Sequence, residues 1–271
     1  MITNIKYPVL TEKDYILGSE RSAPFEVLNP TGDWSSVLVD PEQQKNDRID
    51  TIGCTNFAST SQVEVLLDFL YGIKTNYSER FQAVMSGQTE TGNDPQNVYE
   101  SIRNDGLLPE DFLPFNNDMG FEEYLSPNPM AEGYKIAAKE WLSHYEFKHE
   151  YIYPLGTPKE ERQRLLLQAL KRSPVGVSVY AWHEEGELYT KPEGVQDTHW
   201  TVLIGAVEGS HYIVFDSYFP FIKKLDWNSN FFDIAKGIHI KKKETLGGLG
   251  IFERFRKLFT FIHYPPCLGK K

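Results

Sequence analysis

Residues 50–72 read DTIGCTNFASTSQVEVLLDFLYG, and this stretch places Cys54 directly before a helical pattern. Gly72 is a typical helix end, and the apolar positions that recur at helical spacing before it are Phe57, Val63, Leu66, Leu67, Leu70 and Tyr71. The N–H groups in the first turn of such a helix would face the sulfur and favour its thiolate form. Free cysteines are also among the most buried residues, so packing and nucleophilic chemistry are both open at this point.

Further helices are predicted in the first part of the chain. Residues 93–106 read NDPQNVYESIRNDG, with Asp94 as the N-cap, Pro95 in the first turn and Gly106 at the C-terminal end. Residues 132–146 also show a helical pattern. The first half is therefore expected to be mainly helical.

The pattern changes from helix to strand at Pro174. The last predicted helix covers residues 158–172, with Thr157 as its cap and Pro158 as its first residue. Short runs rich in Val, Ile and Tyr then follow, namely VGVSVYAW, HWTVLIGAV and HYIVFDSY. Helices followed by strands indicate an α+β fold, in which a functional cleft is expected between the two layers.

His199 begins one of these predicted strands, and Asp216 ends the next one. Gly209 and Ser210 form the expected turn between them, so the two ends of the hairpin should lie side by side. A carboxylate beside an imidazole fixes its tautomer and stabilises its cation, as a catalytic base requires. Considered separately, each residue could equally be structural: a hydrogen-bonded strand histidine and a residue at a strand end.

Cys54 and His199 are 145 residues apart, within the roughly 130–150 residues typical of the papain group. Five segments in the same order extend this match: GCTNFAS, GNDPQNVYESIRNDGLLPEDFLPF, SPVGVSVYAW, THWTVLIG and YIVFDSY. Together they resemble the papain-like cysteine peptidases over roughly residues 40–222. The resemblance implies a papain-like fold: a helical part around a central N-terminal helix, an antiparallel sheet or barrel, and an active-site cleft between them.

The resemblance also implies site residues and a reaction. A thiol hydrolase of this family would cleave a peptide or amide bond of a peptide or protein substrate through an acyl-enzyme, without a cofactor or a metal. The residues that match the family's catalytic positions are Cys54, His199 and Asp216, with Gln44 as the expected oxyanion donor, and those that match its substrate-binding segments are Gly92 and Tyr218.

Several positions depart from the family's pattern. Thr55 replaces a large aromatic residue, and Arg48 stands where the family has its oxyanion glutamine. Gln44 or Gln43 could restore that donor from slightly upstream, and we favour Gln44. Asp216 replaces an asparagine, and its charge should favour the imidazolium. The segments DTIGC and DSYFPF look closer to papain-like domains of phages and mobile elements.

Two other functions are compatible with the same residues. A papain-like fold without strong activity could serve as a structural or interaction protein in a larger assembly such as a virion. Bacteriocin-leader peptidases and transglutaminase-like enzymes share the order Cys, His, Asp, but the predicted helix at 95–105 and its following loop favour the papain-like reading.

The composition is that of a folded globular protein and excludes several classes. The 271 residues are 40% hydrophobic and carry a formal net charge of -10, so a nucleic-acid partner is not expected. Two cysteines cannot form a disulfide scaffold, which favours a reducing compartment. The sequence shows no signal-peptide pattern and no run of 18 apolar residues. We expect a cytoplasmic or virion-associated protein without a transmembrane segment.

The chain is expected to have three parts: an N-terminal arm at 1–40, a catalytic domain at 41–240 and an extension at 241–271. Within the extension, GGLG at 247–250 is typical of a hinge, and IFERFRKLFTFI at 251–262 has a basic amphipathic pattern. That segment could pack on its own domain, lie on a membrane or dock on a partner, and the aromatic C-terminal region could provide an assembly contact.

Three further histidines have no expected functional role. WHEEGE, residues 182–187, contains His183 and three glutamates, but neighbouring strand residues point to opposite faces and the spacing is not that of a metal site. His144 and His149 match neither a helix face nor a ligand motif, and we expect them on a solvated surface.

Overall fold

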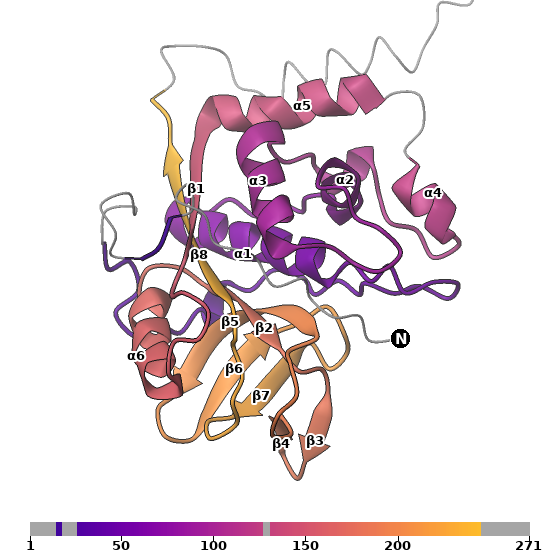
Figure 1. The fold of residues 1–271 in the computed structure, drawn as a ribbon. Helices are drawn as coiled ribbons and strands as arrows, with labels where there is room; N and C mark the ends of the chain where they lie inside the picture. Colours follow the sequence, from indigo (N-terminus) through magenta and orange to yellow (C-terminus); the bar gives the residue numbers. More distant parts are fainter. Residues whose placement is uncertain (1–14, 18–25, 127–130, 245–271) are drawn as a thin grey trace, which may run out of the picture.

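The computed structural model describes residues 15–17, 26–126 and 131–244. Six α-helices and eight strands are present in this part of the chain, and α1 crosses the middle of the molecule between a helical part and the sheet (Figure 1). The helices are α1 (Cys54–Tyr71), α2 (Glu79–Met85), α3 (Pro95–Asp105), α4 (Phe121–Leu125), α5 (Ala131–His144) and α6 (Lys159–Leu170), with short 3-10 helices at Ser35–Val37 and Glu110–Phe112.

The strands form one mixed sheet in the order β1-β8-β2-β5-β6-β7-β4-β3. Their bounds are β1 (Tyr145–Tyr151), β2 (Val175–Val179), β3 (His183–Glu185), β4 (Leu188–Thr190), β5 (His199–Val207), β6 (His211–Phe215), β7 (Ile222–Asp226) and β8 (Ala235–Lys242). The neighbours pair antiparallel, apart from the parallel contact of β4 with β7. The expectation of strands after Pro174 is thus confirmed, whereas closure into a barrel stays a prediction.

Helix α1 is buried on all sides rather than along one stripe. It packs against β5, α2 and α3, and both its apolar and its polar side chains are mostly buried. Buried polar groups must find hydrogen-bond partners: Gln62 Nε2 donates to the carbonyl of Pro174 at 2.7 Å, and Glu64 accepts from the backbone N–H of Tyr77 at 2.7 Å. Gly72 ends the helix at φ 63°, as expected.

Helix α3 agrees with its sequence signals, but α6 does not. The Asp94 side chain accepts the N–H of Gln96 and caps α3. Helix α6 instead begins at Lys159, with Pro158 in an extended N-cap conformation. The expected cap of α6 at Thr157 is therefore wrong, because its hydroxyl donates to the carbonyl of Pro154 at 2.7 Å and stabilises the preceding turn.

His149 lies in the interior, so its expected place on a solvated surface is wrong. It belongs to β1, which pairs with β8 along its whole length, and its side chain is buried. Its Nε2 is 3.1 Å from Glu100 Oε1 on α3. Burial lowers the pKa of His149 to about 4 against the opposing effect of Glu100, so the neutral ring is a hydrogen-bonded core residue.

Parts of the predicted arm and extension lie outside the described residues. Trp34, which belongs to the predicted arm, is fully buried in the main core, and its Nε1 donates to the carbonyl of Leu170 at 2.8 Å. The segments 247–250 and 251–262 are not described. Among the helices that the structure does describe, none is long and apolar enough to cross a membrane.

Candidate active site

Cys54 is the first residue of α1. The backbone before it is unusual at Ile52, which has φ 53°, while Gly53 has φ -95°. Gly53 is needed for close packing rather than for a left-handed turn, because a Cβ there would lie 2.9 Å from Thr51 Oγ1. Its carbonyl accepts the N–H groups of Asn56 and Phe57, which starts the helix directly at the sulfur.

His199 and Asp216 meet at one end of the β5–β6 hairpin. His199 is the first residue of β5, and Asp216 directly follows β6. The His199 Nε2 atom is 2.6 Å from Asp216 Oδ1, and both side chains are almost fully buried. The contact expected from the hairpin is therefore present. It leaves Nδ1 as the ring nitrogen available to Cys54.

The charges at this site stabilise the protonated imidazole. Burial by itself would lower the pKa of His199, but the charges of Asp216 and Cys54 and side-chain hydrogen bonds to both raise it to about 10. Burial opposes ionisation of Asp216, and the nearby cations His199 and Lys223 outweigh it and lower the pKa of Asp216. An imidazolium next to a sulfur at a helix N-terminus is the arrangement that favours a thiolate.

Gln44 is buried in a hydrogen-bond network beside the hairpin. Its Oε1 accepts from Ser217 Oγ at 2.7 Å. Its Nε2 donates to Asp50 Oδ1 at 2.9 Å and to the Tyr218 hydroxyl at 2.7 Å. The Tyr218 hydroxyl in turn donates to Asp50 Oδ2 at 2.6 Å, and its ring centroid is 5.4 Å from that of His199. Both amide hydrogens of Gln44 therefore already have acceptors.

The chain is similar in fold to solved structures of known proteins. No family model matches the sequence, and no curated protein matches it. The structure of digestive procathepsin L 3 of the Tenebrio molitor larval midgut matches with a TM-score of 0.56 at 18% identity, over 87% of this chain and 74% of that chain. A recombinant stem bromelain precursor matches with a TM-score of 0.52 at 16% identity, over 79% and 70% of the two chains. The fold is papain-like.

Gly92 and Tyr218 were the two substrate-binding candidates, and their hydrogen bonds differ. Gly92 has φ 94° and forms a tight turn with Thr89, through N–H···O contacts of 3.0 and 3.2 Å. Among the described hydrogen bonds, none joins Gly92 to Cys54, His199 or Asp216. Gly92 therefore remains a prediction of the resemblance, whereas Tyr218 is in the network around His199.

Two residues beside His199 and Asp216 were missed by sequence analysis. Lys223 Nζ is 2.8 Å from Asp216 Oδ2, and Trp182 has its ring centroid 5.4 Å from that of His199. The alternation of strand β7, in which Lys223 and Leu225 are buried and Ile222 and Lys224 exposed, could have indicated that Lys223 points inward. A lysine on the buried face of a strand is a signal because lysine is almost never buried unless it is paired.

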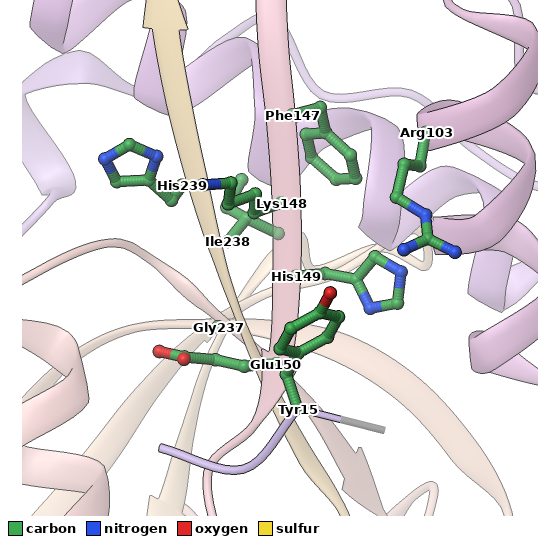
Figure 2. A pocket seen from close by; sticks show the side chains of 9 residues that line it. All are labelled: Tyr15, Arg103, Phe147, Lys148, His149, Glu150, Gly237, Ile238 and His239. Atoms are coloured by element: carbon green, nitrogen blue, oxygen red, sulfur yellow. The ribbon is translucent and has the colours of Figure 1, made fainter. Parts of the chain in front are cut away.

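Within residues 15–17, 26–126 and 131–244, no group of three or more His, Cys, Asp or Glu side chains could hold a metal ion, and the exposed His183 pairs with Glu185. A cavity of about 260 Å³ lies along β1 and β8, lined by His149 and His239 together with Arg103 from α3 (Figure 2). Cys54, His199 and Asp216 do not line it.

Proposed function

We propose that this protein is a cysteine-type hydrolase that cleaves peptide or amide bonds. The observation that carries the proposal is the contact of His199 with Asp216 at 2.6 Å. Against the effect of burial, Asp216 and Cys54 together raise the pKa of His199 to about 10. A thiolate–imidazolium pair of this kind supplies both the nucleophile and the proton of acyl transfer. The papain-like fold supports this proposal, and a cleft above the sulfur is part of what we propose.

The reaction would proceed in two steps. In the first, Cys54 Sγ attacks the carbonyl carbon, the C–N bond breaks, and the leaving nitrogen takes the proton from His199 Nδ1. In the second, His199 removes a proton from water, the oxygen attacks the thioester carbon, and the C–S bond breaks to return the electron pair to sulfur. Asp216 would orient His199 throughout both steps.

The oxyanion would be stabilised by the backbone N–H of Cys54 and by Gln44. Because Gln44 Nε2 donates to Asp50 and Tyr218, one of these two acceptors would have to be replaced by the oxyanion. If the oxyanion replaces Tyr218, the Tyr218 hydroxyl would be free to accept from the substrate, in agreement with its expected role. Gly92 would contribute a substrate contact only if the loop at residues 89–92 reaches the bound peptide.

Alkylation of Cys54 tests this proposal directly. Iodoacetamide at pH 7, followed by mass spectrometry, should modify Cys54 in the folded protein in preference to the chain's other thiol, Cys267. His199→Ala should slow this reaction at least about tenfold, because an unperturbed thiol with a pKa of about 8.5 is only a few per cent ionised at pH 7. A Cys54 that stays unmodified, or that reacts equally in both proteins, would contradict an activated thiol.

A non-catalytic role in a larger assembly, such as a phage virion, is the competing proposal. It is favoured by Arg48 at the family's oxyanion position and by the fully used amide of Gln44. The discriminating comparison is wild type against Cys54→Ala, assayed on a peptide mixture and by size measurement. Hydrolysis by wild type alone supports the enzyme, whereas no hydrolysis and an unchanged assembly in both supports the scaffold.

A further inference from the structure

Lys223 occupies a position where a lysine needs a specific reason to be. It lies on the inward face of β7, and its side chain is 1% exposed. Removing an ammonium from water is costly unless its charge and all its hydrogens find partners. We therefore expect the surroundings of Lys223 to contain a countercharge and hydrogen-bond acceptors that explain its burial.

All three hydrogens of the Lys223 ammonium have acceptors. Nζ donates to Asp216 Oδ2 at 2.8 Å, to the Tyr218 carbonyl at 2.6 Å and to the Pro220 carbonyl at 2.5 Å. It also lies 4.8 Å from the centroid of the Trp182 ring, a distance that adds a cation–π attraction. Lys223 thus links the Asp216 carboxylate to the backbone of the segment after β6.

The two oxygens of Asp216 divide their partners. Oδ1 contacts His199 Nε2 at 2.6 Å, and Oδ2 accepts from Lys223 and from the backbone N–H of Tyr218 at 3.2 Å. This division fixes the plane of the carboxylate on both sides. It also places one positive charge directly against the negative charge that faces the imidazole.

We propose that Lys223 is a positioning residue of the catalytic triad Cys54, His199 and Asp216. Lys223 holds Asp216 toward His199 and offsets the charge of that carboxylate. The proposal rests on the proposed function, and it explains how an aspartate can stand where the family has a neutral asparagine. The ion pair of Asp216 and Lys223 presents His199 with an oxygen acceptor, while its net charge is zero.

The offset matters because His199 must release its proton as well as hold it. A buried carboxylate at 2.6 Å with no counter-charge would stabilise the imidazolium strongly and would retard proton transfer to the leaving nitrogen. The charged or titratable groups that face His199 are Cys54 from α1, Asp216 and Tyr218 after β6, and Lys223 from β7, with Asp50 and Tyr189 one contact farther away. Lys223 is the cation among them.

The titration of His199 tests the proposal without any need for catalysis. In a Cys54→Ser background, the pKa of His199 is measured by NMR on protein labelled at histidine. Lys223→Met should raise this pKa by about one unit, the usual size for loss of a nearby charge. Lys224→Met, an exposed lysine next to it on the same strand, should leave it unchanged.

A purely structural lysine predicts the opposite result. If Lys223 only maintained the fold, its loss would loosen the contact of His199 with Asp216, and the pKa would fall toward 6.5. No shift, or a fall, in Lys223→Met overturns the proposal.

Removing both charges provides a second readout should the single variant fold poorly. In Asp216→Asn/Lys223→Met, the pKa of His199 should lie between that of Asp216→Asn, the lowest, and that of the unsubstituted background. Any other order contradicts the charge offset.

Hydrolysis assays separate this inference from the proposed function. If wild type cleaves no peptide but the pKa of His199 rises in Lys223→Met, the hydrolase proposal fails and the role of Lys223 stands. If wild type is active and the pKa does not rise, the reverse holds.

Discussion

Gln44 has two amide hydrogens, and at the scale of single residues their use decides how the oxyanion hole can work. Asp50 and the Tyr218 hydroxyl accept them in the structure. The same contacts keep Gln44 next to the residues that follow Asp216, since Ser217 donates to its Oε1. A glutamine ten positions before Cys54, rather than six, is thus held at the hairpin by side-chain contacts that spacing alone does not reveal.

The Gln44→Ala variant should lower kcat by about 10²–10³, the usual effect of removing one oxyanion donor. Alkylation of Cys54 by iodoacetamide should proceed at the wild-type rate, because this reaction forms no oxyanion. The matched control is Gln43→Ala, a neighbouring glutamine that should retain full activity. Equal hydrolysis by both variants would remove Gln44 from the reaction, and slower alkylation in Gln44→Ala would assign it to triad geometry instead.

At the scale of elements, the packing of α3 against α5 depends on one glycine. Gly106 follows α3 with φ 82° and ψ -160°, a conformation open essentially to glycine alone. A Cβ at this position would lie 2.1 Å from the carbonyl oxygen of Ala138 in α5. The end of α3 therefore meets α5 through backbone atoms, and no change of side-chain rotamer could make room for a larger residue at position 106.

The comparison of Gly106→Ala with Gly87→Ala separates this contact from backbone strain. Gly87 also has a positive φ, of 75°, but a Cβ there would meet nothing within 4 Å. We expect Gly87→Ala to lower the free energy of unfolding by about 1–2 kcal/mol and Gly106→Ala to lower it by about 1–3 kcal/mol more. Urea denaturation measures both, and equal losses would show that the helices can move apart freely.

Element prediction from the sequence mostly succeeded where local chemistry decides, the cap at Thr157 being the exception, and failed where distant partners decide. The cap at Asp94 and the stop at Gly72 use groups within a few residues, so both could be read directly. Strand β1 was missed because its pairing partner β8 is about 90 residues away. The hairpin of His199 and Asp216 was predictable since turn and strands are contiguous, whereas the partner of Asp216 on β7 required the third strand to be in place.

At the scale of the whole molecule, buried carboxylates couple stability to pH. Glu64 in α1 and Glu79 in α2 are buried, and burial raises the pKa of each well above the usual range. Burial likewise raises the pKa of Glu110 to about 8, with nearby Glu42 contributing in the same direction. These three lie between the central helix and the helical part, so their ionisation acts where the elements meet.

The sign of this coupling follows from proton binding. An acid whose pKa is raised in the folded state holds its proton more tightly there than in the unfolded chain, so the folded state binds more protons between the two pKa values. For Glu110 the stability should therefore be highest below about pH 4.5, fall as the pH rises, and level off above about pH 8. The raised pKa of His199, about 10, likewise contributes stability that is lost as the pH rises from about 6.5 to about 10, so wild type alone cannot isolate the carboxylates.

Glu110→Gln isolates the contribution of Glu110, because an amide does not ionise. The amide also keeps an oxygen that can accept the Phe115 N–H, which donates to Glu110 Oε1 at 2.8 Å. We expect the free energy of unfolding of this variant, relative to wild type, to rise from pH 5 to pH 8 as the wild-type carboxylate becomes charged. Urea denaturation at the two pH values measures the difference, with Glu122→Gln, at an exposed position of α4, as the matched control. A difference that does not change with pH would mean that Glu110 ionises in the folded protein as easily as in water, and that the junction between α1 and the helical part is open to solvent.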